Sequence, residues 1–306
     1  MNTISDELNA DGDCSLREAI RSANTDTPVD GCGGGRGPDE IRFAPGVVPE
    51  TFTITLAGAD EDSAETGDLD ITDDLIITGA GAADTVIDGN QLDRVFHVIG
   101  PVTVELNGLT IQNGQTQSGG GIRSEAVEGG AGFSMLKITQ SMIRDNTASN
   151  DGGGINIKPG NKLELTDSRV LNNSAGDDGG GIEAEAGSDI TIADSTFTDN
   201  TASRGGGIDN EGGITVTDSL VSENEATDDG GGIRNEEAAD RNSPTSSRLT
   251  ILNSTIRENT AHNRGGGIRN ENEGTVIIMN SIRSMVTPLP TMGIGTAGVV
   301  SIIAAT

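Results

Sequence analysis

The sequence has no Trp, no Tyr and only five Phe in 306 residues. This excludes a conventional aromatic-rich core, and the aromatic platforms that usually line carbohydrate clefts are missing too. The remaining apolar residues, about a third of the chain, are mostly Ile, Leu, Val and Ala. Thin layers of aliphatic side chains therefore have to form the interior.

Positive charge is also scarce. Only three Lys are present, and 19 basic residues face 48 acidic ones, which gives a net charge of -29. Such a surface repels nucleic acids, polyanionic glycans and anionic membranes, so we expect no nucleic-acid partner. Composition leaves two explanations for the acidity open, solubility in a salty medium and cation binding.

Long apolar runs are lacking as well. The uncharged stretch 286–306 contains Pro288, Pro290 and several Gly, so we predict no transmembrane span in this chain. The first residues have no apolar core of an export signal, and we expect that such a signal has been removed.

Cysteine occurs only twice, at Cys14 and Cys32. An even pair in a Gly-rich chain of extracellular character favours a disulfide, and two unpaired thiols are the alternative. A metal site on these thiols is not expected, because the only histidines, His97 and His262, lie far away in sequence. We interpret both histidines as ordinary structural or surface residues and expect no cofactor.

The chain also contains a sequence repeat. The phrase Gly-Gly-Gly-Ile recurs at intervals of 25 to 35 residues and starts at Gly119, Gly152, Gly179, Gly205, Gly230 and Gly265. Between copies, an alternating apolar stretch leads to a Ser that is followed five residues later by an Asn. Self-similarity at this period is the signature of a solenoid. Useful helical periodicity is missing after residue 24, which argues against helical or leucine-rich repeats.

One unit of about 25 residues fits three short strands and three turns. The alternation places Ile214 and Val216 inside and Thr215 outside. Asn tolerates left-handed turn positions, and stacked Asn side chains form hydrogen-bonded ladders. We therefore predict an asparagine ladder, with five independent turn residues as the alternative. Its members would be Asn146, Asn173, Asn200, Asn224 and Asn259.

The residue before each Gly triplet also forms a series. In chain order it is Ser118, Asp151, Asp178, Arg204, Asp229 and Arg264. If the coils stack in register, the last four alternate in sign along one column. Exposed pairs of this kind contribute only about 0–1 kcal/mol each. We interpret the column as setting register and maintaining solubility.

Residues 1–37 stand apart as an N-terminal cap. A strand-like stretch begins at Ile4, and Ser15 with Glu18 forms a capping box at the start of a short amphipathic helix. Such a helix is marginal alone, and the open end of a solenoid is the surface that it would cover. A Gly-rich link then leads into the solenoid at 38–306.

Several stretches resemble a known family. Residues 11–20 (Asp-Gly-Asp-Cys-Ser-Leu-Arg-Glu-Ala-Ile) are similar to the N-terminal signature of CSLREA-domain proteins, and the later repeats resemble those of polymorphic outer-membrane proteins. The resemblance implies a secreted or surface-attached right-handed parallel β-helix of the pectate-lyase-like kind. That family has no general activity, so it assigns no catalytic residue here.

Individual residues are consistent with two kinds of chemistry, carbohydrate cleavage and Ca²⁺ binding. A glycosidase needs two carboxylates at a fixed separation, and among 48 acidic residues many pairs satisfy that requirement by chance. A lyase that acts on acidic polysaccharides would need bound Ca²⁺ and basic groups. The candidate basic groups are Arg204, Arg234, Arg264 and Arg269. Turn carboxylates before the Gly triplets offer weak Ca²⁺ ligands, namely Asp177, Asp178, Asp228 and Asp229. A phosphate loop is excluded, because no Lys follows any Gly triplet.

The sequence therefore predicts an all-β fold, a right-handed parallel β-helix solenoid with a short N-terminal capping α-helix. The favoured role is a non-enzymatic, structural or adhesive element outside the cell or on its surface. Its partners would be other copies of itself, added end to end, or a cell-surface glycan. The alternative is a carbohydrate-active enzyme. Residues 283–306 break the repeat, and for 285–292 we hypothesise a local frameshift.

Overall fold

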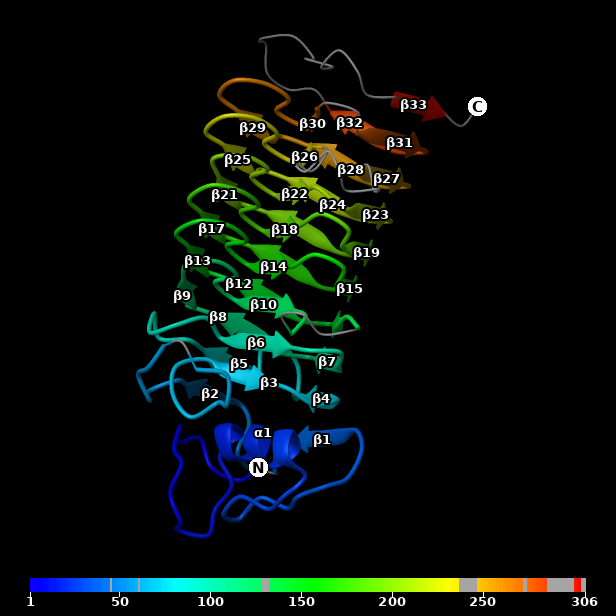
Figure 1. The fold of residues 1–306 in the computed structure, drawn as a ribbon. Coiled ribbons are helices and arrows are strands. Elements are labelled where there is room, and N and C mark those ends of the chain that lie inside the picture. Colours follow the sequence, from blue (N-terminus) through cyan, green and yellow to red (C-terminus); the bar gives the residue numbers. More distant parts are fainter. Residues whose placement is uncertain are drawn as a thin grey trace.

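The computed structural model describes residues 1–44, 46–59, 61–127, 132–236, 247–271, 274–284 and 300–303. The chain winds upward as a stack of coils from one helix, α1 (Leu16–Thr25), to the last strand, β33 (Val300–Ile303) (Figure 1). Every strand pairing is parallel and joins strands of neighbouring coils, for example Ile122 on β10 with Ile155 on β14. The predicted parallel β-helix with a short N-terminal helix is confirmed.

The strands form four sheets along the axis. The first sheet contains β1 (Asp39–Arg42), β4 (Leu75–Thr78), β7 (Thr103–Asn107), β11 (Met135–Thr139), β15 (Lys162–Thr166), β19 (Asp189–Ala193), β23 (Gly213–Thr217), β27 (Arg248–Leu252), β31 (Thr275–Met279) and β33. The second contains β3 (Leu69–Ile71), β6 (Phe96–Ile99), β10 (Ile122–Glu125), β14 (Ile155–Ile157), β18 (Ile182–Ala184), β22 (Ile208–Asn210), β26 (Ile233–Asn235) and β30 (Ile268–Asn270).

The third sheet contains β2 (Glu50–Thr53), β5 (Thr85–Asp88), β8 (Thr110–Gln112), β12 (Met142–Arg144), β16 (Arg169–Leu171), β20 (Thr196–Thr198), β24 (Leu220–Ser222), β28 (Thr255–Arg257) and β32 (Ile282–Ser284). The fourth contains the two-residue strands β9 (Gln115–Thr116), β13 (Thr147–Ala148), β17 (Ser174–Ala175), β21 (Thr201–Ala202), β25 (Glu225–Ala226) and β29 (Thr260–Ala261). A regular coil therefore has four strands, not three, because the segment after each ladder asparagine also pairs with its neighbours.

The interior is a column of aliphatic layers. Ile214 and Val216 are buried and Thr215 between them is partly exposed, as the alternation predicts. The Gly triplets belong to the same stacking, because the middle Gly of every triplet but the last lies against the backbone of the next coil. A Cβ on Gly153 would lie 2.5 Å from the carbonyl oxygen of Gly180 and 2.6 Å from the carbonyl carbon of Ser174. A side chain at that position has no room.

The five predicted asparagines lie in one buried column. In each step, both the backbone N–H and the side-chain Nδ2 donate to Oδ1 of the asparagine one coil later, at 2.9–3.1 Å. The left-handed position is not the ladder residue itself but the residue before it, such as Asn172 with φ 55° or Asp199 with φ 55°. A parallel serine column includes Ser141, whose backbone N–H donates to Ser168 Oγ at 3.1 Å.

The N-terminal helix seals the first coils. Its capping box is complete, since Ser15 Oγ accepts from the Glu18 N–H and the Glu18 carboxylate accepts from the Ser15 N–H. Leu16, Ile20 and Ala23 are buried in the same core as the first strands. The predicted Cys14–Cys32 disulfide is present and closes the loop beside the helix.

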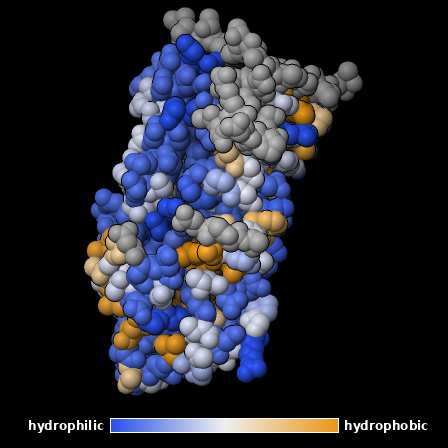
Figure 2. Space-filling view, in the orientation of Figure 1, coloured by the Kyte–Doolittle hydropathy of each residue, from blue (hydrophilic) through white to orange (hydrophobic). Residues whose placement is uncertain are grey.

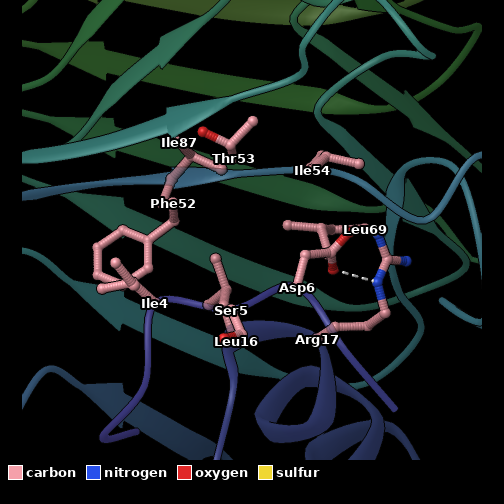
Figure 3. A pocket seen from close by; sticks show the side chains of 10 residues that line it. All are labelled: Ile4, Ser5, Asp6, Leu16, Arg17, Phe52, Thr53, Ile54, Leu69 and Ile87. Atoms are coloured by element: carbon pink, nitrogen blue, oxygen red, sulfur yellow. Dashed lines mark hydrogen bonds and ion pairs between the residues drawn. The ribbon is translucent and has the colours of Figure 1, made fainter.

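The predicted strand at Ile4 is wrong. Residues 1–37 hold no strand, only an isolated bridge between Val29 and Cys32. The segment docks through Asp6, whose carboxylate accepts the N–H groups of Thr55 and Leu56 at 2.7 and 2.9 Å and pairs with Arg17 at 2.6 Å. Figure 3 shows this contact beside a small, largely apolar pocket below β2. Side-chain bonding has replaced backbone pairing here.

Two further predictions are the absence of a transmembrane span in 286–306 and a frameshift at 285–292, and both stretches lie mostly outside the described residues. The ten-residue α1 is too short to cross a bilayer, and the described part of the chain holds no longer helix. The frameshift hypothesis for 285–292 concerns residues outside those described. Of the irregular end 283–306, only the backbone of β32 and β33 is described.

Candidate functional site

A row of polar side chains runs along the outer face of the second sheet. In each regular coil it is the residue after the Gly-Gly-Gly-Ile phrase, which points away from the core because its Ile points inward. Strand register places these residues directly above one another. We call them the polar column: Asp70, His97, Arg123, Asn156, Glu183, Asp209, Arg234 and Arg269.

The polar column is buried although it faces outward, apart from Arg123, which is partly exposed. Glu183 is 4%, Asp209 0% and Arg234 3% exposed. The first Gly of each triplet explains part of this burial, because the turn closes over the base of the column. A Cβ on Gly205, for example, would lie 2.7 Å from the Cβ of Asp209. Figure 2 shows a mostly hydrophilic surface in the view of Figure 1.

Two rows flank the polar column. One is the series before the Gly triplets, whose stacking is confirmed by the parallel bridges Asp178–Arg204 and Asp229–Arg264. The other is the residue two positions after each column member from Arg123 to Arg269. It comprises Glu125, Lys158, Glu185, Glu211, Glu236 and Glu271. The three rows together carry acids in excess over bases.

Arg234 is the centre of a buried ion network. Its Nη1 donates to Asp209 Oδ2 at 2.8 Å and to Asp178 Oδ1 at 3.2 Å, and the guanidinium also pairs with Glu236 and, at 3.6 Å, with Glu271. Burial and these carboxylates act in opposite directions on the pKa of Arg234, and the carboxylates prevail, so it is raised. From the sequence, Arg234 is expected only as one of the basic groups of a lyase that binds acidic substrates.

Two carboxyl groups in the network have a raised pKa. Burial, reinforced by Asp209, raises the pKa of Glu183 well above its usual range. The same causes raise the pKa of Asp178 to about 8, although Arg234 and Arg204 oppose them. Oε2 of Glu183 and Oδ1 of Asp209 accept no hydrogen bond. Buried acceptors without donors are costly, and shifted carboxyl groups of this kind concentrate at functional sites.

The chemistry available here is proton donation and hydroxyl binding. Glu183 and Asp209 are in-register neighbours on adjacent strands, whose backbones lie about 4.8 Å apart. Burial raises the pKa of both carboxyl groups, and Arg234, which bonds to Asp209, opposes that rise at Asp209. Two carboxyl groups in such different environments can divide the roles of acid and base between them.

The lower end of the polar column holds His97. Its Nε2 lies 2.8 Å from Glu125 Oε1, and its Nδ1 lies 3.3 Å from Asp70 Oδ1. Burial lowers the pKa of His97, but the neighbouring carboxyl groups of Asp70 and Glu125 outweigh burial and raise it. Burial opposes but does not cancel the effect of His97 on Glu125, whose pKa falls to about 2. His97 is therefore the centre of a second charged cluster.

The structure separates the four predicted Ca²⁺ ligands. Asp177 and Asp178 lie together with Asp151, but Arg204 binds both, with its Nη2 2.7 Å from Asp177 Oδ1 and its Nε 2.7 Å from Asp178 Oδ1. The guanidinium of Arg204 therefore supplies the positive charge beside Asp177 and Asp178. Asp228 and Asp229 lie further along the axis.

The second predicted pair has other partners. Asp228 accepts a hydrogen bond from Asn263 at 3.0 Å, and Asp229 lies 3.8 Å from Arg269 Nε. Of the four candidate arginines, three enter the charged rows as ion-pair partners, and Arg264 stacks on Asp229. Glu183 and Asp209 were missed. The only available signal was their shared position directly after the Gly-Gly-Gly-Ile phrase.

Comparison with known proteins supports the fold. Residues 75–247, more than half of the chain, match the family model described as right handed beta helix region. A search of curated proteins and one of solved structures found no match. The match begins at β4, spans the regular coils, and includes most of the polar column. This chain belongs to the right-handed β-helix family.

Proposed function

We propose that this β-helix acts outside the cell or on its surface and binds an uncharged, hydroxyl-rich glycan along the polar column. The observation that carries the proposal is the set of buried, in-register charged side chains with unpaired carboxyl oxygens at Glu183 and Asp209. A purely structural coil needs no such groups on its outer face. Glu183 and Asp209 are themselves buried, so the half-buried Glu185 and Glu211 beside them would make the first contacts with sugar hydroxyls.

The net charge of the three rows limits the class of glycan that can bind. Arg234 is surrounded by Asp178, Asp209, Glu236 and Glu271, so its charge is more than balanced. Uronate polymers and other anionic glycans would be repelled. An uncharged chain lying along the axis would meet one member of the polar column at every coil, although the residue type changes from coil to coil.

The disulfide supports the proposed location. Cys14 and Cys32 form a disulfide that staples the cap, and such bonds persist in oxidising compartments outside the cytosol. The acidic surface would keep the protein soluble there.

Affinity electrophoresis through gels containing neutral or uronate polysaccharides tests the proposal. We expect at least one neutral polymer to retard the protein and the uronate polymers not to. Replacing the half-buried Glu185 and Glu211 with Ala should weaken retardation about fivefold or more. Glu164→Ala, an exposed change on the first sheet, is the control. Failure of every neutral polymer, or equal loss in the control, would refute glycan binding.

The second candidate function is glycoside hydrolysis. It is favoured by the in-register pair Glu183 and Asp209. Protonated Glu183 would give its proton to the glycosidic oxygen while the Asp209 carboxylate attacks the anomeric carbon; water would then release the sugar and restore both groups. Reducing ends should appear from neutral polysaccharides and disappear with Glu183→Gln. If the wild-type protein binds but releases none, the function is binding alone.

Assembly end to end is a further part of the proposed surface role. Helix α1 packs against β1 and β3 and closes the first end. The first sheet ends at β33, whose outer edge has no partner strand within the described residues. Growth would therefore proceed from that edge. Scattering over a concentration series should show rods of increasing length, and a constant length would exclude assembly.

A further inference from the structure

A compact cluster lies where β3 and β6 meet the preceding loop, low in the stack (Figure 1). It contains Asp70 on β3, His97 on β6 and Asp62 in the loop. One ligand atom from each lies within 4.8 Å of the others. His97 Nδ1 is 3.3 Å from Asp70 Oδ1 and 3.8 Å from Asp62 Oδ1. This cluster is distinct from the network around Arg234.

Glu125 fixes the orientation of the imidazole. Its Oε1 lies 2.8 Å from His97 Nε2, so a proton on Nε2 is donated to the carboxylate. In the neutral ring this leaves the lone pair on Nδ1, directed at the two aspartates. A carboxylate behind a histidine in this way is the usual support for a metal-binding imidazole.

Asp70 supplies an independent indication of a ligand. The residue is fully buried, and its Oδ2 accepts the Ala64 N–H at 2.8 Å. Its Oδ1 accepts no hydrogen bond, although it is also buried and faces His97. An unpaired buried carboxylate oxygen is costly, and a cation bound between Asp70 and His97 would remove that cost.

We propose that His97 Nδ1, Asp70 Oδ1 and Asp62 Oδ1 bind a divalent transition metal, with Zn²⁺ the best fit, and that water completes the site. Ligands of tetrahedral Zn²⁺ lie about 3.4 Å apart, given metal–ligand bonds of about 2.0–2.2 Å. The distance from His97 Nδ1 to Asp70 Oδ1, 3.3 Å, is close to this value, and the distance from His97 Nδ1 to Asp62 Oδ1, 3.8 Å, is a few tenths of an ångström longer. An imidazole ligand favours Zn²⁺ over Ca²⁺ or Mg²⁺.

The surrounding charges suit a cation. The nearest bases are already paired, because Arg94 Nη1 binds Asp68 at 2.9 Å and Arg123 Nη2 binds Glu125 at 2.6 Å. The two aspartates therefore give the site a net negative charge. The Asp62 side chain is 74% exposed, which leaves a path for the metal and room for water.

A protonated His97 could satisfy the same contacts without metal, and the experiment has to separate the two. The full chain, stripped with EDTA and dialysed, is titrated with Zn²⁺ by calorimetry and with Co²⁺ by visible absorption. We expect one Zn²⁺ per chain, a tetrahedral Co²⁺ spectrum, and a higher melting temperature with Zn²⁺. Ca²⁺ should bind at least tenfold more weakly.

Variants assign the site. His97→Gln should abolish binding. Asp62→Asn, which changes an exposed loop residue and should leave folding intact, should weaken binding at least tenfold. His262→Gln, at the other histidine of the chain, should bind as the wild type does. Absence of a one-to-one complex, binding unchanged in Asp62→Asn, or equal loss in His262→Gln would overturn the proposal. No glycan is present, so the result is independent of glycan binding.

Discussion

Asn173 donates twice to the same oxygen of Asn200, from its backbone N–H at 3.1 Å and from its side-chain Nδ2 at 3.0 Å. Asn200 repeats the arrangement towards Asn224, and its Nδ2 also reaches the Val170 carbonyl at 2.9 Å. Asn200 thus bonds both to the coil before it and to the coil after it. The column fixes the register of all the regular coils.

Removing one member of this column should destabilise the whole stack. Asn200→Ala leaves the donors of Asn173 buried without an acceptor, so we expect a loss of about 2–4 kcal/mol in unfolding free energy. Denaturant unfolding followed by circular dichroism measures it. Asn150→Ala, at an exposed turn asparagine, should change stability by less than about 0.5 kcal/mol. Similar losses at both positions would contradict the role of the ladder.

The Gly triplets should tolerate no side chain at their middle position. In Gly153→Ala the new Cβ would lie 2.5 Å from the Gly180 carbonyl oxygen, so neighbouring coils would have to separate. We expect a loss of more than about 3 kcal/mol or failure to fold. Gly213→Ala is the matched control, because its Cβ would meet only the Ser188 carbonyl oxygen at 3.7 Å. Its melting temperature should equal or exceed that of the wild type.

The cap should depend on Arg17 more than on its neighbours. Arg17 is fully buried and bonds to Asp6 and to the carbonyls of Gly67 and Asp68 at 2.8 and 3.2 Å. Arg17→Ala leaves Asp6 without its charge partner, and we expect a loss of about 3–5 kcal/mol. Arg21→Ala, which removes an exposed pair with Glu65, should cost at most about 1 kcal/mol. A cap held mainly by apolar packing would give two similar values.

The stability of the protein should fall as pH rises from about 4 to about 8. In the folded state the pKa of Asp178 is raised to about 8, and that of Glu183 is raised well above its usual range. The folded protein therefore binds these protons more tightly than the unfolded chain. Their contribution is complete below the unfolded pKa near 4 and is lost as pH rises through the folded pKa. Glu125, with a pKa lowered to about 2, acts in the opposite direction at lower pH.

Glu183→Gln tests this dependence, because Gln keeps the shape of the protonated acid. The variant should be more stable than the wild type at pH 8, by about 1 kcal/mol or more, and nearly equal to it at pH 4. Melting temperatures across this range measure the effect. Glu164→Gln, on an exposed position of β15, should follow the wild type at every pH. Parallel curves for the wild type and Glu183→Gln would show that Glu183 is already ionised when folded.

Local chemistry explains why much of the fold is predictable. The capping box of Ser15 and Glu18 determines where α1 begins, and strict alternation determines that Ile214 and Val216 face inward. The repeated asparagines could be assigned to one column because a solenoid brings equivalent positions into register. The same reasoning wrongly predicted a strand at Ile4. A strand needs a neighbouring strand to pair with, and this segment is held instead by hydrogen bonds to the side chain of Asp6.

The amino-acid sequence by itself determined the repeat, the inward face of each strand and the residues of the asparagine column, because these depend on periods of two residues and of one coil. Only the tertiary structure decided which charged groups meet. Arg234 and Asp178 are 56 residues apart in the chain, and Asp62 and His97 are brought together by a loop outside the regular coils. Whether such groups are buried depends on the turns that cover them in the folded chain. The order of charges along the sequence does not show which turns do so.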